Sequence, residues 1–169
     1  MKDIKQNGFT MVELIITIAV LSFGIVSGYT AFSSIANIAD SLSYRLTAAF
    51  LSQEGLEIIK NQRDKNFISA ALWNAGLLSC SDGCQADYKT GTIEEEAANQ
   101  LQAYDEDAYL KINTDGFYSY DAGTDTRFKR KITITQESAS ILKVNSEVSW
   151  DYNNRSFTKE TIEYLYNWY

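Results

Sequence analysis

The chain has 169 residues and carries 22 acidic against 15 basic side chains, a formal net charge of −7. Its length allows one domain of ordinary size beside an anchor helix, and an apolar content of 45% allows that domain a core. The acidic balance argues against a dedicated nucleic-acid binder, which usually presents a basic face. Because the chain has no histidine and no glycine-rich phosphate loop, we expect neither enzymatic activity nor a cofactor.

A single carboxylate interrupts a long apolar stretch near the N-terminus. Lys2 and Lys5 precede this stretch, and Glu13 is then the only charged residue before Asp40. Residues 9–33, at about 1.5 Å each, are long enough to cross a bilayer core of about 30 Å. The two lysines predict a cytoplasmic N-terminus. A carboxylate inside a membrane helix costs roughly 2.5–3.5 kcal/mol near the helix centre, so it normally has a partner and a function.

Cleavage of the chain after Gly8 supplies such a partner. The new α-amine of Phe9 then lies four residues before Glu13, at the same end of the apolar helix. The G-F-T-M-V-E segment that begins at Gly8, behind a leader of residues 1–8, resembles the N-terminus of type IV prepilins. The resemblance implies that prepilin peptidase cuts after Gly8 and that Phe9 becomes the N-methylated mature terminus. It also implies that Glu13 pairs with the N-terminus of a neighbouring subunit during filament assembly.

Two simpler explanations of the apolar stretch remain open. A conventional secretory signal is cut after its apolar core at small residues, and residues 34–36 offer a poor site of that kind. A plain membrane anchor keeps Met1. Neither explanation accounts for the charge at Glu13 or for the Gly8–Phe9 junction in front of the apolar core. Processing after Gly8 is therefore the favoured interpretation.

Helical periodicity continues past the span. Residues 34–66 predict an amphipathic half of the same helix, whose apolar stripe we expect to pack against a globular head. The stripe consists of Ile35, Ile38, Leu42, Leu46, Ala49, Leu56 and Ile59. The segment Q-E-G-L-E-I-I-K-N-Q-R-D at 53–64 resembles one found in V-type minor pilins. We interpret Glu54 and Glu57 in this segment as part of a solvated face, with contact to a neighbouring subunit as the alternative.

Residues 67–107 form a variable region that contains a cysteine loop. Residues 67–78 predict a short helix, and a capping box at 92–95 predicts a second helix over about 93–103. In an extracytoplasmic domain the spacing of Cys80 and Cys84 predicts a disulfide, with Asp82-Gly83 as the turn between them. A zinc site is the weaker alternative, because two thiolates without histidine do not complete its shell. Two free thiols are the third option, in a host that lives without oxygen.

Residues 108–169 predict an antiparallel β-sheet. The Asp115-Gly116 pair is a hairpin signal between strands at 108–113 and 117–120. Alternating apolar residues predict longer strands at 127–136 and 141–150, and Asn153-Asn154 predicts a turn into a last strand over 156–166. Together these elements predict an α+β fold in which a long N-terminal helix packs on a sheet of about four strands. The type IV pilin resemblance implies the same layout.

Two surface segments are weaker candidates for ligand sites. Asp121 and Asp125 bracket a loop with oxygen ligands for calcium, but their spacing does not match an EF-hand. A plain loop is favoured, and no metal site is predicted. The only basic cluster is Lys129-Arg130-Lys131, which is a candidate for DNA contact. The alternating faces of a strand would split these three residues, and the overall charge opposes DNA.

The sequence therefore predicts a single-span protein of the cytoplasmic membrane that is processed and then enters an extracellular or periplasm-spanning filament. The favoured role is a minor pilin, in motility, adhesion or filament priming. Its expected partners are prepilin peptidase, other pilin subunits, the assembly platform of the inner membrane and, before assembly, membrane lipid. The alternatives are a pseudopilin of a type II secretion system, a competence pilin and a non-assembling anchored binding domain.

Overall fold

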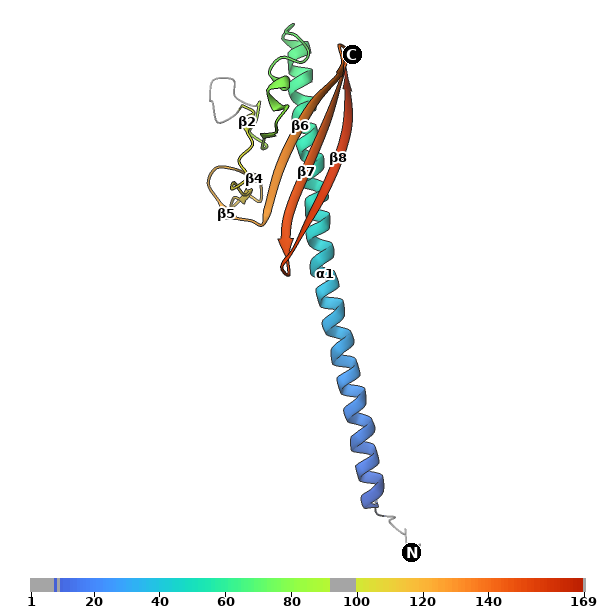
Figure 1. The fold of residues 1–169 in the computed structure, drawn as a ribbon. Helices are drawn as coiled ribbons and strands as arrows, with labels where there is room; N and C mark the ends of the chain where they lie inside the picture. Colours follow the sequence, from blue (N-terminus) through green and yellow to red (C-terminus); the bar gives the residue numbers. More distant parts are fainter. Residues whose placement is uncertain (1–7, 9, 92–99, 169) are drawn as a thin grey trace, which may run out of the picture. The chain divides into compact units, whose positions relative to one another are not determined.

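A computed structural model describes residues 8, 10–91 and 100–168. The chain divides into two compact units, residues 1–43 and 44–169. Helix α1, Met11–Ile68, supplies the described helix of the first unit and continues into the second, which also contains all the described strands (Figure 1). We call the second unit the head. The helix ends two residues beyond the predicted end at residue 66.

The head contains a five-stranded antiparallel sheet with the order β2-β1-β6-β7-β8. Three long strands make up most of it: β6 is Phe128–Ser138, β7 is Ile141–Tyr152 and β8 is Arg155–Tyr166. Strands β1, Cys84–Gln85, and β2, Gln102–Ala103, are short. The sheet thus has one long edge strand, β8, and one short one, β2. A long N-terminal helix followed by antiparallel sheets is the predicted α+β fold.

Asn153 and Asn154 form the two-residue loop between β7 and β8. Their φ angles are 51° and 58°, and Tyr152 pairs with Arg155 across the loop. Type I′ hairpin turns need positive φ at both central residues, which asparagine adopts more readily than most residues with a side chain. The turn sets a register that runs from this pair to the pair of Ile141 with Tyr166. The predicted turn and the predicted last strand are both confirmed.

The core lies where alternate residues of β6 and β7 meet the helix. The buried positions of the two strands are Phe128, Arg130, Ile132, Ile134, Leu142, Val144, Ser146, Val148 and Trp150. Their apolar members form two clusters with buried residues of α1, one that includes Ile59 and another that includes Leu51. The predicted inward face of residues 141–150 is therefore confirmed, since its apolar residues are buried there.

The helical stripe predicted to pack on the head is only partly correct. Leu56 and Ile59 are buried, but Leu46 is 56% exposed, and Ala48 and Leu51 are buried instead. Leu46 and Ile59 are 13 residues apart, which at 3.6 residues per turn places them about 140° apart around the helix. Leu46 and Ile59 therefore cannot both lie on the face of the helix that packs against the head. The stripe residues of the first unit, Ile35, Ile38 and Leu42, are all exposed.

The described first part of the variable region, residues 67–91, has less helix than predicted. After α1 the chain turns and forms a short 3₁₀ helix, η1, at Leu77–Cys80, in place of a helix over 67–78. The helix predicted over 93–103 falls partly on residues 92–99, which lie outside the described residues. Its last two residues form β2, which pairs with β1. Strand pairing here satisfies backbone groups that the local sequence alone would place in a helix.

The predicted hairpin at Asp115-Gly116 forms, but in a separate sheet. Strands β3, Lys111–Ile112, β4, Tyr118–Ser119, and β5, Thr124–Asp125, make a three-stranded sheet with the order β4-β3-β5. The Asn113 side-chain oxygen accepts hydrogen bonds from the backbone N–H groups of Asp115 and Phe117, both at 2.9 Å, which stabilises the loop. Strand β5 was not predicted, because a two-residue strand shows no apolar alternation.

Candidate processing and assembly site

The helix begins two residues after the predicted cleavage point. Gly8 is exposed and lies outside the helix, and Phe9 lies outside the described residues. Thr10 caps the helix, because its side-chain oxygen accepts a hydrogen bond from the Glu13 backbone N–H at 3.2 Å. The Thr10 carbonyl accepts a backbone bond from the Leu14 N–H at 3.1 Å. Thr10, the residue that follows Phe9 in the sequence, therefore sets the start of α1.

Glu13 lies in the first turn of α1. A negative side chain is favourable there, because the free N–H groups of a helix start carry a partial positive charge. The side chain is exposed, and among the described residues it forms no hydrogen bond or ion pair. The carboxylate is thus available to an external positive group.

The rest of the first unit is suited to an apolar environment. Its large apolar side chains are between 53% and 79% exposed, and α1 is long and apolar enough to cross a membrane. Three hydroxyl groups bond to carbonyls of their own helix: Thr17 to Leu14, Ser22 to Ile18, and Thr30 to Val26 and Ser27. Polar groups satisfied within the helix cost little in lipid. Glu13 is the only charged residue between Gly8 and Asp40, and its carboxylate has no such partner among the described residues.

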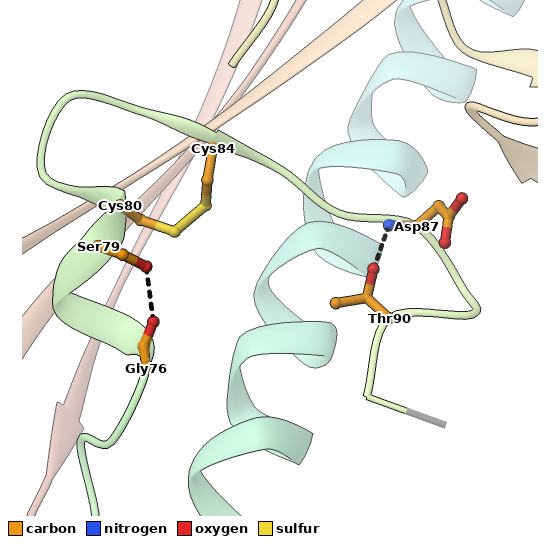
Figure 2. Close-up of a disulfide and its surroundings, with 6 residues drawn as sticks. All are labelled: Gly76, Ser79, Cys80, Cys84, Asp87 and Thr90. Carbon is orange, nitrogen blue, oxygen red and sulfur yellow. Dashed lines mark hydrogen bonds between the residues drawn. A yellow bond between two sulfur atoms is a disulfide. The ribbon is translucent and has the colours of Figure 1, made fainter. Parts of the chain in front are cut away.

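Cys80 and Cys84 form a disulfide, as predicted (Figure 2). Both cysteines are buried, and the bond joins the end of η1 to the start of β1. Gly83, with φ of 111°, permits the tight turn between them, and its N–H donates to the Cys80 carbonyl at 3.2 Å. The two sulfurs are therefore bonded to each other, which leaves neither the free thiols nor the zinc ligands of the alternative interpretations.

The calcium and DNA candidates are not brought together into sites. Asp121 forms an ion pair with Lys89, and Asp125 belongs to β5. No group of three or more acidic or cysteine side chains suited to a metal occurs among the described residues. In the basic cluster, Arg130 is buried while Lys129 and Lys131 are not, so the strand divides the cluster as predicted.

Arg130 and Glu54 form an interaction that the sequence interpretation missed. Arg130 is fully buried and pairs with Glu54 at 3.0 Å. It also donates hydrogen bonds to the carbonyls of Leu51 and Ala86. The placing of Glu54 on a solvated face was therefore wrong, whereas Glu57 is largely exposed and contacts Lys60 on the same helix. The sequence did contain a signal for the burial of Arg130. In a strand whose side chains alternate between two faces, Arg130 lies on the same face as the apolar residues Phe128 and Ile132.

Gly55 brings the helix close to the sheet beside this ion pair. A β-carbon at this position would lie 2.4 Å from the Ser146 side-chain oxygen and 3.1 Å from Cδ of Arg130. The side chain of Ser52, one turn earlier on nearly the same face, donates to the Ser146 carbonyl at 3.0 Å. The E-G pair in the 53–64 segment therefore anchors the helix on the sheet within this chain.

Comparison with known proteins found similarity in the N-terminal segment. A family model described as the prokaryotic N-terminal methylation motif matches residues 4–29. The match contains Gly8, Phe9, Thr10 and Glu13 and ends within the apolar stretch. Comparisons with curated proteins and with solved structures found no match.

Proposed function

We propose that this chain, a type IV pilin-like prepilin by its N-terminal methylation motif, is a minor pilin. The motif implies processing by prepilin peptidase and assembly with other pilins. The proposal adds that the cut falls after Gly8, that Phe9 is the N-methylated mature terminus, and that Glu13 selects the position of the subunit in the filament. The role is structural and not catalytic.

The carboxylate of Glu13 carries the proposal. It is the only charged residue between Gly8 and Asp40, it lies in the first turn of α1, and it forms no ion pair among the described residues. An amine and a carboxylate about 4 Å apart attract each other by about 1 kcal/mol in water and by about 4 kcal/mol at an effective dielectric constant of 20. A neighbour's free N-terminal amine is thus a far stronger partner inside a filament core than at a wet surface.

The helix in the head offers a second contact surface. Leu46 and Phe50 are 56% and 62% exposed, although both are apolar and lie one turn apart on one face. The same helix buries Ala48, Leu51 and Ile59 in the head. We propose that the exposed face packs against the helix of a neighbouring pilin, which removes this apolar surface from water.

The proposed localisation follows from charge and cysteine chemistry. Lys2 and Lys5 favour a cytoplasmic N-terminus, which puts the head on the opposite side of the membrane. The Cys80–Cys84 disulfide supports this orientation, because disulfides persist in oxidising compartments and are rare in the cytosol. Before assembly the chain waits as a single-span membrane protein, and the assembly platform then moves it into the filament.

Mass spectrometry of the N-terminus tests this function. The full chain is co-expressed with an active prepilin peptidase or with a catalytically inactive one, and the mature terminus is sequenced. We expect a chain that starts at N-methylated Phe9 with the active enzyme and an intact Met1 terminus with the inactive one. Gly8→Leu is the matched control, because a bulky side chain at the cut should keep the leader attached.

Three other results would contradict the proposal. A Met1 terminus in the presence of active peptidase returns the chain to a plain membrane anchor. A start beyond Ala36 indicates a conventional signal peptide and removes the free amine beside Glu13. A processed chain that is absent from purified filaments contradicts the pilin role while leaving the cleavage intact.

A further inference from the structure

We propose that Thr10 is a positioning residue for cleavage: by capping α1 it keeps the Gly8 carbonyl outside the helix, where a peptidase can reach it. This inference rests on the proposed function, since it concerns the substrate side of the same cut.

Two hydrogen bonds set the first helical residue. The Thr10 hydroxyl oxygen accepts from the Glu13 N–H, and the Thr10 carbonyl accepts the first helical bond, from the Leu14 N–H. The helix therefore starts at Met11. Gly8 lies outside it, is exposed, and its carbonyl accepts no backbone hydrogen bond from the described residues.

The chemistry of the cut requires this carbonyl to be accessible. Water attacks the Gly8 carbonyl carbon, the bond to the Phe9 nitrogen breaks, and the water oxygen stays on Gly8 as part of a new carboxylate. The Phe9 nitrogen takes up the protons and leaves as an amine. In a helix that started earlier, the Gly8 carbonyl would accept the Val12 N–H and be enclosed by the first turn. The peptidase would then have to open that turn before attack.

The sequence contains a competing helix start. Asn7 lies three residues before Thr10, and asparagine ranks with the best N-cap residues. A helix capped at Asn7 would take Gly8 and Phe9 as its first two residues and so include the scissile peptide. The Thr10 cap and the low helix propensity of glycine both oppose this longer helix. Loss of the Thr10 hydroxyl removes one of the two opposing effects.

A kinetic comparison of Thr10 variants tests the inference. The full chain in detergent micelles is incubated with purified prepilin peptidase, and kcat/KM for release of residues 1–8 is measured by mass spectrometry. Thr10→Val keeps the shape but lacks the hydroxyl, and we expect about a fivefold loss, the equivalent of about 1 kcal/mol of capping. Thr10→Ser and Thr10→Asp retain a capping oxygen and should be cleaved within about twofold of the wild-type chain.

A second-site variant separates helix capping from direct contact with the peptidase. Asn7→Ala removes the competing cap, so in the Thr10→Val background we expect it to restore most of the lost rate, while alone it leaves the rate unchanged. The ¹³C shifts of labelled Gly8, recorded without peptidase, should move toward helical values in Thr10→Val and return in the double variant. This readout does not depend on enzyme contacts.

The outcomes distinguish this inference from the proposed function. Wild-type chain that is never cut after Gly8 overturns both. Normal cleavage of the wild-type chain and of Thr10→Val at equal rates overturns the role of Thr10 alone. Slow cleavage of Thr10→Val with unchanged Gly8 shifts and no rescue by Asn7→Ala also overturns it, because the hydroxyl then acts by touching the peptidase.

Discussion

The two parts of helix α1 contain similar apolar residues but differ in whether their side chains are exposed or buried. In residues 11–43 the large apolar side chains are exposed, whereas in the head Leu51, Leu56 and Ile59 are almost completely buried. The head part is stabilised by the chain's own sheet. The first part finds no such partner among the described residues, so its stability depends on lipid or on other helices. Apolar composition alone therefore does not reveal which environment a helical segment occupies.

The largest expected effect comes from replacing Glu13, which should abolish filament incorporation without changing the stability of the head. Glu13→Ala and Glu13→Lys should block incorporation into filaments, because the subunit loses its partner for a neighbour's N-terminal amine, or repels that amine. The head should keep its near-UV circular dichroism and its melting temperature. Immunoblots of sheared filaments, beside whole-cell controls, measure this. Normal incorporation of either variant contradicts the assembly mechanism.

Replacing Glu54, the carboxylate that pairs with Arg130 in the head, should have the opposite effect and lower the stability of the head. Glu54→Leu leaves the buried Arg130 without its ion pair, which should lower the free energy of unfolding of the head by about 3 kcal/mol. Adding Arg130→Met should recover much of this loss, because both charges are then gone. Denaturant titration in detergent measures the effect, with Glu13→Leu as the control that leaves the head's stability unchanged. A double variant as unstable as the single one would refute the pairing argument.

Burial in the head also predicts a loss of stability in alkali. Tyr120 donates to the Arg130 carbonyl at 3.0 Å, and burial raises the pKa of Tyr120 to about 12. Since the unfolded value is about 10, the stabilisation is complete below pH 10 and is lost as the pH rises to 12, by roughly 3 kcal/mol. Tyr120→Phe should flatten this part of a stability-against-pH curve. Tyr164→Phe, at an exposed position, is the control that should retain it.

The smallest expected change in stability comes from replacing Gly55, with Gly28 as its matched control. Gly55→Ala places a methyl group against Ser146 and should lower the head's free energy of unfolding by about 1–3 kcal/mol. Gly28→Ala meets no atom within 4 Å and should leave the head's melting temperature unchanged. Thermal unfolding in detergent, followed in the near ultraviolet, compares the two. Equal melting temperatures would mean that the helix does not approach the sheet this closely.

The sequence predicted the parts of the fold that have long periodic patterns. The alternation of residues 141–150 gave the inward face of β7, and Asn153-Asn154 gave its turn, because both depend on local backbone preferences. The prediction was wrong where partners are distant. Gln102 and Ala103 form a strand because they pair with β1, and nothing near them in the sequence indicates this.

The sequence names candidate residues for the site but not its geometry. A fixed spacing predicts the roles of Gly8, Phe9 and Glu13, which stay predictions, and the cap at Thr10 is visible only once the start of the helix is known. Glu54 was wrongly placed on the surface because a charged residue on a helix usually faces water. Its partner, Arg130, is 76 residues away, and only the folded chain brings the two together.

The long edge strand β8 affects how closely several copies of the head can pack without aggregating. An exposed edge of 12 residues is a template on which other chains can add strands and aggregate. Charged residues interrupt this edge: Lys159 and Glu160 are exposed, and Glu163 pairs with Lys60 at 2.8 Å. Another strand that docked here would have to bury these charges. Densely packed heads can therefore lie next to one another without fusing their sheets.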